Sequence, residues 1–491
     1  MLAVTTIQVL MSTIMIPLIG TFFILLLNRF SNFRETVTLI TSILLFAAVY
    51  KIFICVMDGD RSELLIFSIT TGLKFSFHVE PLGALFALVA SFLWIVNSIY
   101  SIGYMRGNNE PRQTQFYAAF AIALSATMGI AFSANLFTLF VFYEVLTLST
   151  YPLVAHRADP NARIGGRIYL IYLIGASIVF FIPALLWTLI LAGNLDFKMG
   201  GIISDVASPG TTGILLALFV FGIGKAALMP LHRWLPSAMV APTPVSALLH
   251  AVAVVKAGVF TILKVVIYVI GSDHLLKTGA SEWLIYLASF SLIAASVIAL
   301  TKDNIKARLA YSTVSQLSYI ILAAAIATPL ALMGAAMHIV THAFGKITLF
   351  FVAGAIHTSA HKTRVSELNG IGLSMPFTML AFFIGALSII GLPPLVGVWS
   401  KLYIALGSME GDNSWVIAVL IISSLLNVAY LMPIVIKAFF ASAPKTETTN
   451  PISEAPWLCV VPLSLTALIC LILFFLPGYF ESYLTDFLGP K

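Results

Sequence analysis

Several ionisable side chains lie inside long apolar runs of this 491-residue sequence. Glu144 lies in LFVFYEVLTLST, Lys225 in FGIGKAALMP and Lys256 in VAVVKAGVF. A charged side chain near the centre of a bilayer costs about 2.5–3.5 kcal/mol, so such residues persist mainly where they face a protein interior and serve a function. The pattern therefore predicts a path for protons or another ion through a membrane protein.

Lys225 lies in an apolar run that we expect to break at Pro230. Proline lacks a backbone N–H and clashes with the preceding turn, so the carbonyl groups just after Lys225 lose their helical partners. Those carbonyls form the negative end of a half-helix close to a cation. A broken membrane helix with an ionisable residue at the break is typical of ion sites in secondary transporters.

A second group of basic residues follows in MHIVTHAFGKITLFF, which places His338, His342 and Lys346 four residues apart. On a helix these side chains line one face. Two histidines at this spacing could bind zinc, but Ile339 replaces the glutamate of the HExxH motif and no carboxylate follows. The run therefore predicts a relay of titratable groups and no metal site.

His250 and Glu144 each allow two interpretations. His250 precedes Lys256 by six residues, so the two project about 120° apart on a helix. A histidine satisfied by a backbone carbonyl explains His250 as well as a proton-carrying role does. Glu144 is either a protonated carboxyl bonded to a nearby hydroxyl or a partner of Lys225, since opposite charges within about 4–6 Å hold each other ionised.

A second break is predicted at Pro393 and Pro394, shortly before Lys401 in GLPPLVGVWSKLY. Two proline breaks, each with a nearby lysine and five spans apart, fit two inverted repeats of five helices.

The composition indicates an all-α integral membrane protein. Hydrophobic residues make up 60% of the chain and charged residues 9%, against about 25% charged in soluble domains. The net charge of +6 comes mostly from loops, so it reflects topology and predicts no nucleic-acid partner. Cys55, Cys459 and Cys470 are isolated in apolar runs and are interpreted as packing residues. No cofactor motif is present, so any redox chemistry must belong to partners.

About fourteen spans of roughly 20 apolar residues fit the sequence, of which the seventh and twelfth are broken. They are 4–27, 36–57, 81–101, 114–132, 135–154, 167–192, 212–230, 245–270, 283–301, 309–328, 330–356, 376–407, 414–440 and 457–478.

The loops predict the orientation in the membrane. Alternate loops carry most of the arginines and lysines, so we expect those loops in the cytoplasm and both termini on the other side of a cell inner (plasma) membrane. The first run lacks the positive start of a signal peptide and should remain a membrane helix. Lys264 and Lys437, near span ends, are expected to extend to the interface. His357 and His361 are expected in a solvated loop.

The run KAALMPLHRWLPSAMVAPTPVSALLHA closely resembles the signature of the antiporter-like membrane subunits shared by respiratory complex I, membrane-bound hydrogenases and Mrp-type cation/proton antiporters. KDNIKARLAYSTVSQLSY, from Lys302, resembles a second family signature. The resemblance implies a single polytopic domain comprising N-terminal helices in 1–110, one repeat in 111–271, a second in 282–440 and a last helix at 457–478.

The resemblance also implies roles for the buried residues. Glu144 and Lys225 match a carboxylate–lysine pair near which protons enter. Lys256 matches a central lysine that accepts and releases a proton. His338 and His342 match histidines that link two half-channels, and Lys401 matches the terminal residue of the relay.

Lys401 narrows the type of subunit. The M-type subunit of complex I has a glutamate there, whereas the L and N types and the D-type Mrp protein have lysine. The chain ends soon after its last span, without the lateral helix of the L type, and the histidines with the intact KAALMPLHRWLPSAM run favour a D-like Mrp protein. We therefore expect a proton-translocating subunit of a multisubunit Na⁺/proton antiporter, packed against sister subunits in the lipid bilayer.

Two other functions remain open. The chain could be the proton-pumping subunit of an NADH-quinone oxidoreductase or a membrane-bound hydrogenase, coupled to electron transfer in partner subunits. It could also be a membrane partner for a carbon-uptake protein, a role that some relatives have.

Overall fold

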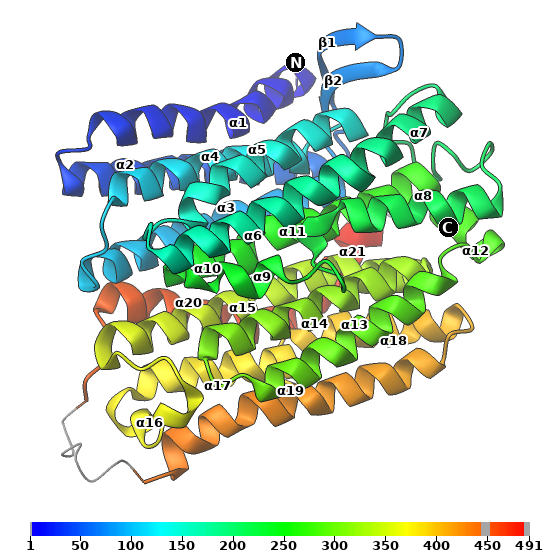
Figure 1. Ribbon diagram of the computed structural model, residues 1–491. Coiled ribbons are helices and arrows are strands. Elements are labelled where there is room, and N and C mark those ends of the chain that lie inside the picture. Colours follow the sequence, from blue (N-terminus) through cyan, green and yellow to red (C-terminus); the bar gives the residue numbers. More distant parts are fainter. Residues whose placement is uncertain (1, 443–451, 486–491) are drawn as a thin grey trace.

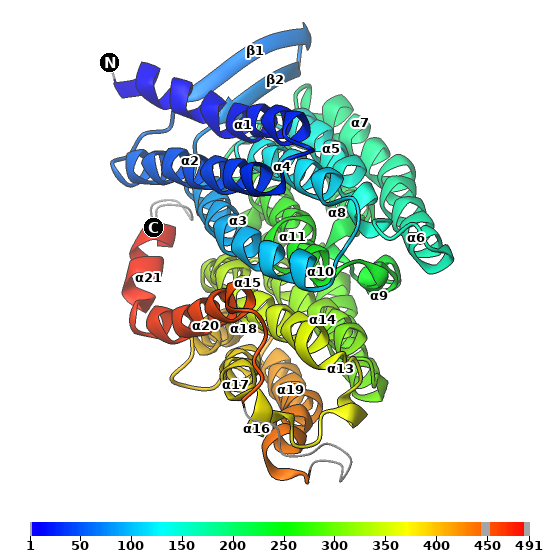
Figure 2. The ribbon, with the colours of Figure 1, turned by 90° about the vertical axis from the view of Figure 1, so that its left-hand side faces the viewer.

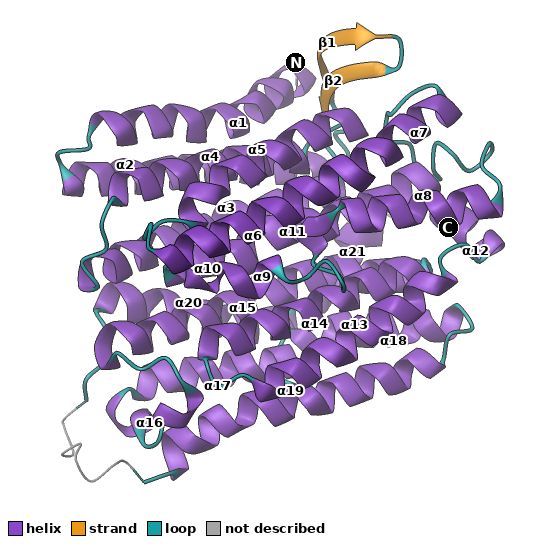
Figure 3. Ribbon diagram, in the orientation of Figure 1, coloured by secondary structure: helices purple, strands orange, loops and turns teal. Residues whose placement is uncertain are grey.

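The chain folds into a bundle of long helices that run side by side (Figures 1 and 3). The computed structural model describes residues 2–442 and 452–485. Within them, twelve helical segments are long and apolar enough to cross a membrane, judged by length and composition. Two shorter apolar helices, Pro209–Gly222 and Pro376–Ile390, coincide with the broken seventh and twelfth predicted spans. The helical membrane fold is confirmed, whereas the count of fourteen, the two repeats and the domain boundaries stay predictions.

The first part of the chain contains α1 (Leu2–Leu26), α2 (Ser31–Met57), β1 (Glu63–Thr70), β2 (Leu73–His78), α3 (Pro81–Gly107), α4 (Gln113–Ala131), α5 (Leu136–Val154), α6 (Pro160–Ala176), the π-helical turn η1 (Ser177–Phe181), α7 (Ile182–Ala192), α8 (Pro209–Gly222), the 3-10 turn η2 (Gly224–Ala226), α9 (Trp234–Ser237), η3 (Ala238–Val240), α10 (Thr243–Ala247), the π-helical turn η4 (Leu248–Val252), α11 (Val254–Lys264), the π-helical turn η5 (Val265–Ile270) and α12 (Ser272–Thr278).

The second part contains α13 (Glu282–Thr301), α14 (Ile305–Ile326), α15 (Pro329–Ala360), η6 (Val365–Glu367), α16 (Ile371–Ser374), α17 (Pro376–Ile390), α18 (Gly397–Glu410), α19 (Trp415–Phe440), α20 (Trp457–Ile472), η7 (Leu473–Phe475) and α21 (Pro477–Thr485).

The purely helical prediction missed a two-stranded sheet. Strands β1 and β2 pair antiparallel, with Glu63 opposite His78 and Thr70 opposite Leu73. In Figure 1 the hairpin lies beside the right-hand end of α1. Its short alternating strands lie between two long apolar spans, so a search for spans passes over them.

Two segments form the core of the bundle. The segment 243–270, which includes α10 and α11, and helix α15 are buried along their whole apolar windows. Figure 2 shows α11 and α15 between the N-terminal helices and α19. In contrast, only 33–39% of the apolar windows of α1, α2 and α19 is buried, as is usual for helices that face lipid. The ionisable residues of the core segments are therefore shielded from lipid.

The break in the seventh span is confirmed, but its predicted position at Pro230 is wrong. Helix α8 ends at Gly222, before Lys225, which lies in the turn η2. The Trp234 indole nitrogen donates to the Gly224 carbonyl at 3.0 Å, and the Lys225 amide donates to the Tyr143 hydroxyl at 3.0 Å. These tertiary hydrogen bonds satisfy the backbone outside the helix, so the helix ends about two turns before Pro230.

The break in the twelfth span is confirmed where Pro393 and Pro394 predict it. Helix α17 ends at Ile390, followed by Gly391 with φ +87°, and α18 begins at Gly397. A left-handed glycine is a common helix end because it lacks a Cβ that would clash. Lys401 lies just over one turn into α18.

Candidate functional site

Lys225 lies at one end of a row of buried basic residues, in the turn η2 beside α5. Its Nζ donates hydrogen bonds to the Tyr143 carbonyl at 2.8 Å and the Thr147 hydroxyl at 2.6 Å. The same nitrogen lies 3.1 Å from the centroid of the Tyr143 ring, a cation–π contact. Neutral groups therefore hold this lysine.

Glu144 is the neighbour of Tyr143 on α5, yet among the described residues no ion pair joins it to Lys225. One of its carboxyl oxygens, Oε1, is buried and has no hydrogen-bond partner in that part of the chain. Tyr143 and Thr147 are four residues apart and share a face, whereas Glu144 projects about 100° away from Tyr143. The structure therefore does not form the direct pair that the resemblance implied.

Lys256 contacts His342 at the centre of the bundle. The Lys256 Nζ lies 2.6 Å from the His342 Nδ1. Only one of these two nitrogens can hold the proton between them, because a hydrogen bond needs one donor and one acceptor. The π-helical turn η4 precedes Lys256 on this segment, and such turns are frequent at functional sites. The contact can therefore pass a proton between α11 and α15.

His338 continues the row along α15, which confirms that it shares a face with His342. The two rings have centroids 5.8 Å apart and are stacked. The His338 Nδ1 lies 2.8 Å from the Ser400 hydroxyl on α18. The His338 ring also stacks on Tyr319, with centroids 5.4 Å apart. His338 therefore bridges α15 to the region of Lys401.

Lys401 lies at the other end of the row and binds the end of α17. Its Nζ donates to the Ile389 carbonyl at 3.0 Å and the Ile390 carbonyl at 2.8 Å. It also lies 4.8 Å from the centroid of the Tyr319 ring. A cation at the carboxyl end of a helix is favoured by the helix dipole.

Lys346 extends the row along α15 away from His338. Its Nζ donates to the Ser312 hydroxyl at 2.6 Å, and that hydroxyl lies 2.7 Å from the Tyr430 hydroxyl. Lys346 therefore connects α15 to α14 and α19 through neutral hydroxyl groups.

His250 is fully buried in η4, and neither of its ring nitrogens has a hydrogen-bond partner among the described residues. Its ring packs on Phe350, with centroids 4.7 Å apart. The alternative in which a backbone carbonyl satisfies His250 is therefore wrong. Buried polar atoms without a protein partner are usually satisfied by ordered water.

The hydroxyl groups of the site were not predicted. The hydroxyls of Thr147, Ser312 and Ser400 each bind one basic residue, and the Tyr319 ring lies against His338 and Lys401, but serine, threonine and tyrosine are common throughout the apolar runs. Only their contacts in the fold set these four apart from the others.

The prediction that Lys264 extends to the membrane interface is wrong. Its Nζ lies 2.7 Å from the Glu80 carboxylate, and the two side chains are only 1% and 5% exposed. It also donates to the Ser133 carbonyl at 3.0 Å. The ends of α3, α4 and α11 meet here, so a residue near the end of its own span is enclosed by its neighbours.

His357 also lies elsewhere than predicted. It is half-buried near the end of α15 rather than in a loop, whereas His361 is exposed just beyond that helix.

The donor set does not favour a metal. In the part of the chain that the structure describes, no group of three or more His, Cys, Asp or Glu side chains comes together. The His342 Nδ1 faces the Lys256 amine, which competes with a cation for that position. The absence of cofactors stays a prediction.

Comparison with known proteins shows the family. Residues 133–427 match the family model described as "NADH:quinone oxidoreductase/Mrp antiporter, TM", and residues 67–117 match "NADH-Ubiquinone oxidoreductase (complex I), chain 5 N-terminus". NADH-quinone oxidoreductase subunit N of Desulforudis audaxviator is 34% identical over 75% of this chain and 73% of its own. NAD(P)H-quinone oxidoreductase chain 5 of Synechocystis is 31% identical over 67% of this chain, which spans only 49% of that relative.

Two solved structures share the fold. A chain of the archaeal membrane-bound sulfane sulfur reductase superposes with a TM-score of 0.86 and 25% identity, over 97% of this chain and 96% of its own. A chain of the Mrp complex from Dietzia superposes with a TM-score of 0.84 and 19% identity, over 98% of both chains. With the family model covering more than half of its length, the chain belongs to the NADH:quinone oxidoreductase/Mrp antiporter transmembrane family.

Proposed function

We propose that the chain is a proton-translocating subunit of a multisubunit cation/proton antiporter, similar to the D-type Mrp protein, and that the complex exchanges Na⁺ for protons. The observation that carries the proton path is the row of buried basic residues from Lys225 to Lys401. Its lysines contact carbonyls, hydroxyls and an imidazole rather than carboxylates. A buried lysine without a carboxylate in direct contact is held less firmly as an ammonium ion than one in an ion pair, so it can release its proton to a neighbour.

The proton route follows the contacts of the row. A proton arriving near Glu144 and Lys225 reaches Lys256, which exchanges it with His342 across 2.6 Å. His338 and Tyr319 then lead toward Lys401. Lys346 and His250 lie beside His342 and alter its proton affinity by charge repulsion when they are protonated. Between Lys225 and Lys256 transfer requires water, as in other membrane proton relays.

The cation exchange is supported by residue types. Lys401 matches the lysine of the L, N and D types, and His338 and His342 together with the intact KAALMPLHRWLPSAM run favour the D type. Sodium crosses the membrane in the assembled complex, in which sister subunits pack against this chain. We propose a cell inner membrane with both termini non-cytoplasmic, because the loops at 27–30, 108–112 and 302–304, which carry Arg29, Arg112 and Lys302, lie at the end of the bundle opposite the hairpin (Figure 1).

A redox-driven proton pump is the second candidate. The 34% identity to an NADH-quinone oxidoreductase subunit N favours it. In that case electron transfer in partner subunits drives proton movement along the same row of residues, and the proton path is unchanged.

The test is dissipation of a pH gradient on addition of sodium, in inverted vesicles from an antiporter-deficient host that expresses the whole gene cluster. We expect sodium-dependent dissipation that disappears in Lys225→Ala and persists in Lys277→Ala, a matched lysine outside the buried row. No response to any monovalent cation, with proton pumping only when a reductant is supplied, would replace the antiporter by the redox candidate.

A further inference from the structure

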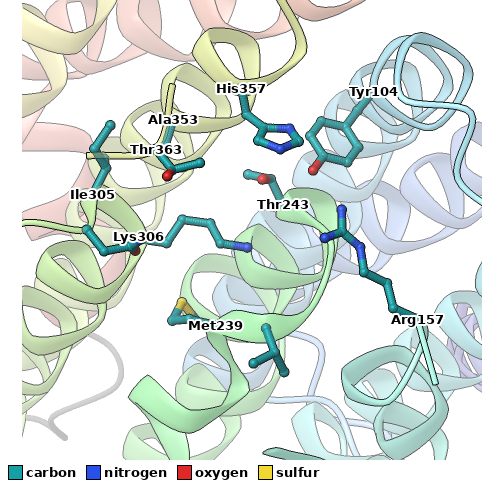
Figure 4. A pocket seen from close by; sticks show the side chains of 11 residues that line it. Tyr104, Arg157, Met239, Thr243, Ile305, Lys306, Ala353, His357 and Thr363 are labelled. Carbon is teal, nitrogen blue, oxygen red and sulfur yellow. The ribbon is translucent and has the colours of Figure 1, made fainter. Parts of the chain in front are cut away.

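A cavity opens at the end of the bundle opposite the hairpin, between α3, α10, α14 and α15. Its volume is about 190 Å³. In Figure 4 the side chains of Lys306, Arg157, Thr243, Tyr104 and His357 point toward one common space. These residues come from five separate segments, so the cavity is formed by the fold and not by any local motif.

The lining of the cavity is basic. Lys306 donates from its Nζ to the Ala241 carbonyl at 2.6 Å. Arg157 forms an ion pair with Glu110. The hydrogen bond from the Arg157 guanidinium to Glu110 is the main reason why the pKa of Arg157 is raised. Among the described residues, no carboxylate lines the cavity itself. Because Lys306 and Arg157 face the cavity and no carboxylate among its described lining residues offsets their charge, the cavity repels a metal cation such as Na⁺.

His357 lies on the cavity wall and on the same stripe of α15 as the buried row. It follows Lys346 by eleven residues, which is about three turns and a rotation of only about 20°. Phe350 and Ala353 lie between them on that stripe. The His357 Nδ1 is buried and has no hydrogen-bond partner among the described residues. Its charged or titratable neighbours are Arg157, Lys306, His361, Glu110 and Tyr104, whose ring stacks on it.

The wall of the cavity that α10 forms also leads toward the buried row. Thr243 lines the cavity and precedes His250 by seven residues, about two helical turns. The His250 ring, with two nitrogens that lack a partner in the described part of the chain, packs on Phe350 of the α15 stripe. Both walls therefore converge on His250 and Lys346, the part of the row nearest to this end of the bundle.

We propose that this cavity is the mouth through which the buried row exchanges protons with the side opposite the hairpin, that His357 carries the proton there, and that the basic lining excludes sodium. The proposal rests on the proposed proton translocation. The His357 ring accepts a proton from water at one nitrogen and releases the proton on its other nitrogen to a second water that leads toward His250. The ring returns to its starting state when its tautomer reverses, so no other reactant is consumed.

The first test measures access without measuring flux. In the assembled complex, Ala353→Cys should react with membrane-impermeant thiol reagents from the cavity side only. An anionic reagent should react about tenfold faster than a cationic one of equal size, because the basic lining attracts it. Lys306→Gln should reduce that ratio toward one.

Two controls accompany the labelling. The parent chain, with its three native cysteines, sets the background, and Ala336→Cys, fully buried on α15 away from the cavity, should remain unlabelled. If Ala353→Cys folds poorly, Thr363→Cys, exposed at the cavity rim, replaces it. Labelling of Ala353→Cys from the hairpin side, or a faster reaction with the cationic reagent, would overturn the proposal.

The second test measures proton flux and rescue. His357→Ala should lower proton flux by about tenfold, typical for a lost proton-transfer group, and imidazole added on the cavity side should restore most of it. His361→Asn, which changes an exposed neighbour, should leave flux unchanged. If His357→Ala retains full flux while Lys256→Met loses it, protons do not enter through this cavity, although the buried row still conducts them. If the unsubstituted complex moves no protons while labelling follows the expected pattern, the proposed function fails and the cavity remains.

Discussion

Lys256 and Lys264 lie on the same helix, α11, and both are buried, yet their partners differ in charge. The Lys256 Nζ contacts the neutral imidazole of His342 at 2.6 Å. The Lys264 Nζ contacts the Glu80 carboxylate at 2.7 Å. A carboxylate holds its partner in the ammonium form, whereas an imidazole can take the proton over. Burial alone therefore does not identify a proton carrier, and the chemistry of the partner does.

The same distinction applies to the whole row. Lys225, Lys346 and Lys401 donate to carbonyl and hydroxyl oxygens, which are neutral. Lys264 also donates to a carbonyl, but it has a counter-charge in addition. We infer that the row conducts protons and that the pair of Lys264 and Glu80 fastens the ends of α3, α4 and α11 together.

The largest effect is expected from Lys256→Met. Removing the central amine interrupts the contact with His342, so proton flux through the assembled complex should fall on the order of a hundredfold. Assembly, followed by native gel electrophoresis, should persist because methionine fills a similar volume. Flux within about twofold of the parent would show that the row does not pass through Lys256.

Lys264→Met should act on stability instead. Breaking a buried ion pair from one side leaves Glu80 charged and unpaired, which costs about 3–5 kcal/mol. The thermal midpoint of unfolding should fall accordingly. Replacing both partners, in Glu80→Gln with Lys264→Met, should recover most of the loss, since no buried charge remains. Flux per folded complex in this double variant should equal that of the parent, and a lasting loss of flux would place the pair in the proton path.

A smaller effect should separate the two ends of the row. Thr147→Val removes one of the two oxygen acceptors of the Lys225 Nζ, so flux should fall by several-fold. Ser424→Ala removes an acceptor from Lys401 at 3.2 Å but leaves two carbonyls in place, and flux should fall by less than about twofold. The bond that Lys225 loses corresponds to about 1 kcal/mol, whereas the longer bond of Lys401 is replaced in part by its two remaining acceptors. Equal losses in both variants would contradict this account of the two lysines.

The smallest effect is expected at Asp303, in the loop after α13, which does not belong to the buried row. Asp303 accepts hydrogen bonds from the Ser366 hydroxyl at 2.7 Å and its amide at 3.0 Å. The hydrogen bond from the Ser366 hydroxyl is the main reason why the pKa of Asp303 is lowered. Its contribution is therefore present above the usual aspartate range, about pH 4, and is lost as the pH falls through the lowered value.

Asp303→Asn should lower the thermal midpoint by about 1 °C near pH 7, and the difference should shrink below about pH 4. A difference that grows with acidity would contradict the assigned direction.

Much of the fold could be predicted because its signal is local. Long apolar runs predict membrane helices, and the proline pair at Pro393 and Pro394 predicts the break before Lys401. The position of the first break could not be predicted in this way. It depends on the Trp234 indole and the Tyr143 hydroxyl, which reach the backbone of η2 from other parts of the chain.

In the candidate site, too, local features could be predicted and contacts between distant parts of the chain could not. The spacing of His338, His342 and Lys346 already predicts a shared helix face, because periodicity within one helix is a local property. The contact of Lys256 with His342, the hydroxyls that bind the lysines, and the Glu80 partner of Lys264 all join residues far apart in the sequence. None of these contacts leaves a periodic signal, and the prediction for Lys264 was wrong for that reason.

The most direct test compares Lys256→Arg with Lys264→Arg in one proton-flux assay on the assembled complex. Arginine keeps the positive charge but does not release its proton in proteins. We expect Lys256→Arg to lose flux by about tenfold or more, while Lys264→Arg, whose guanidinium still pairs with Glu80, remains close to the parent. Full flux in Lys256→Arg would contradict the central claim, because the row would then need only a charge at that position and not a proton that comes and goes.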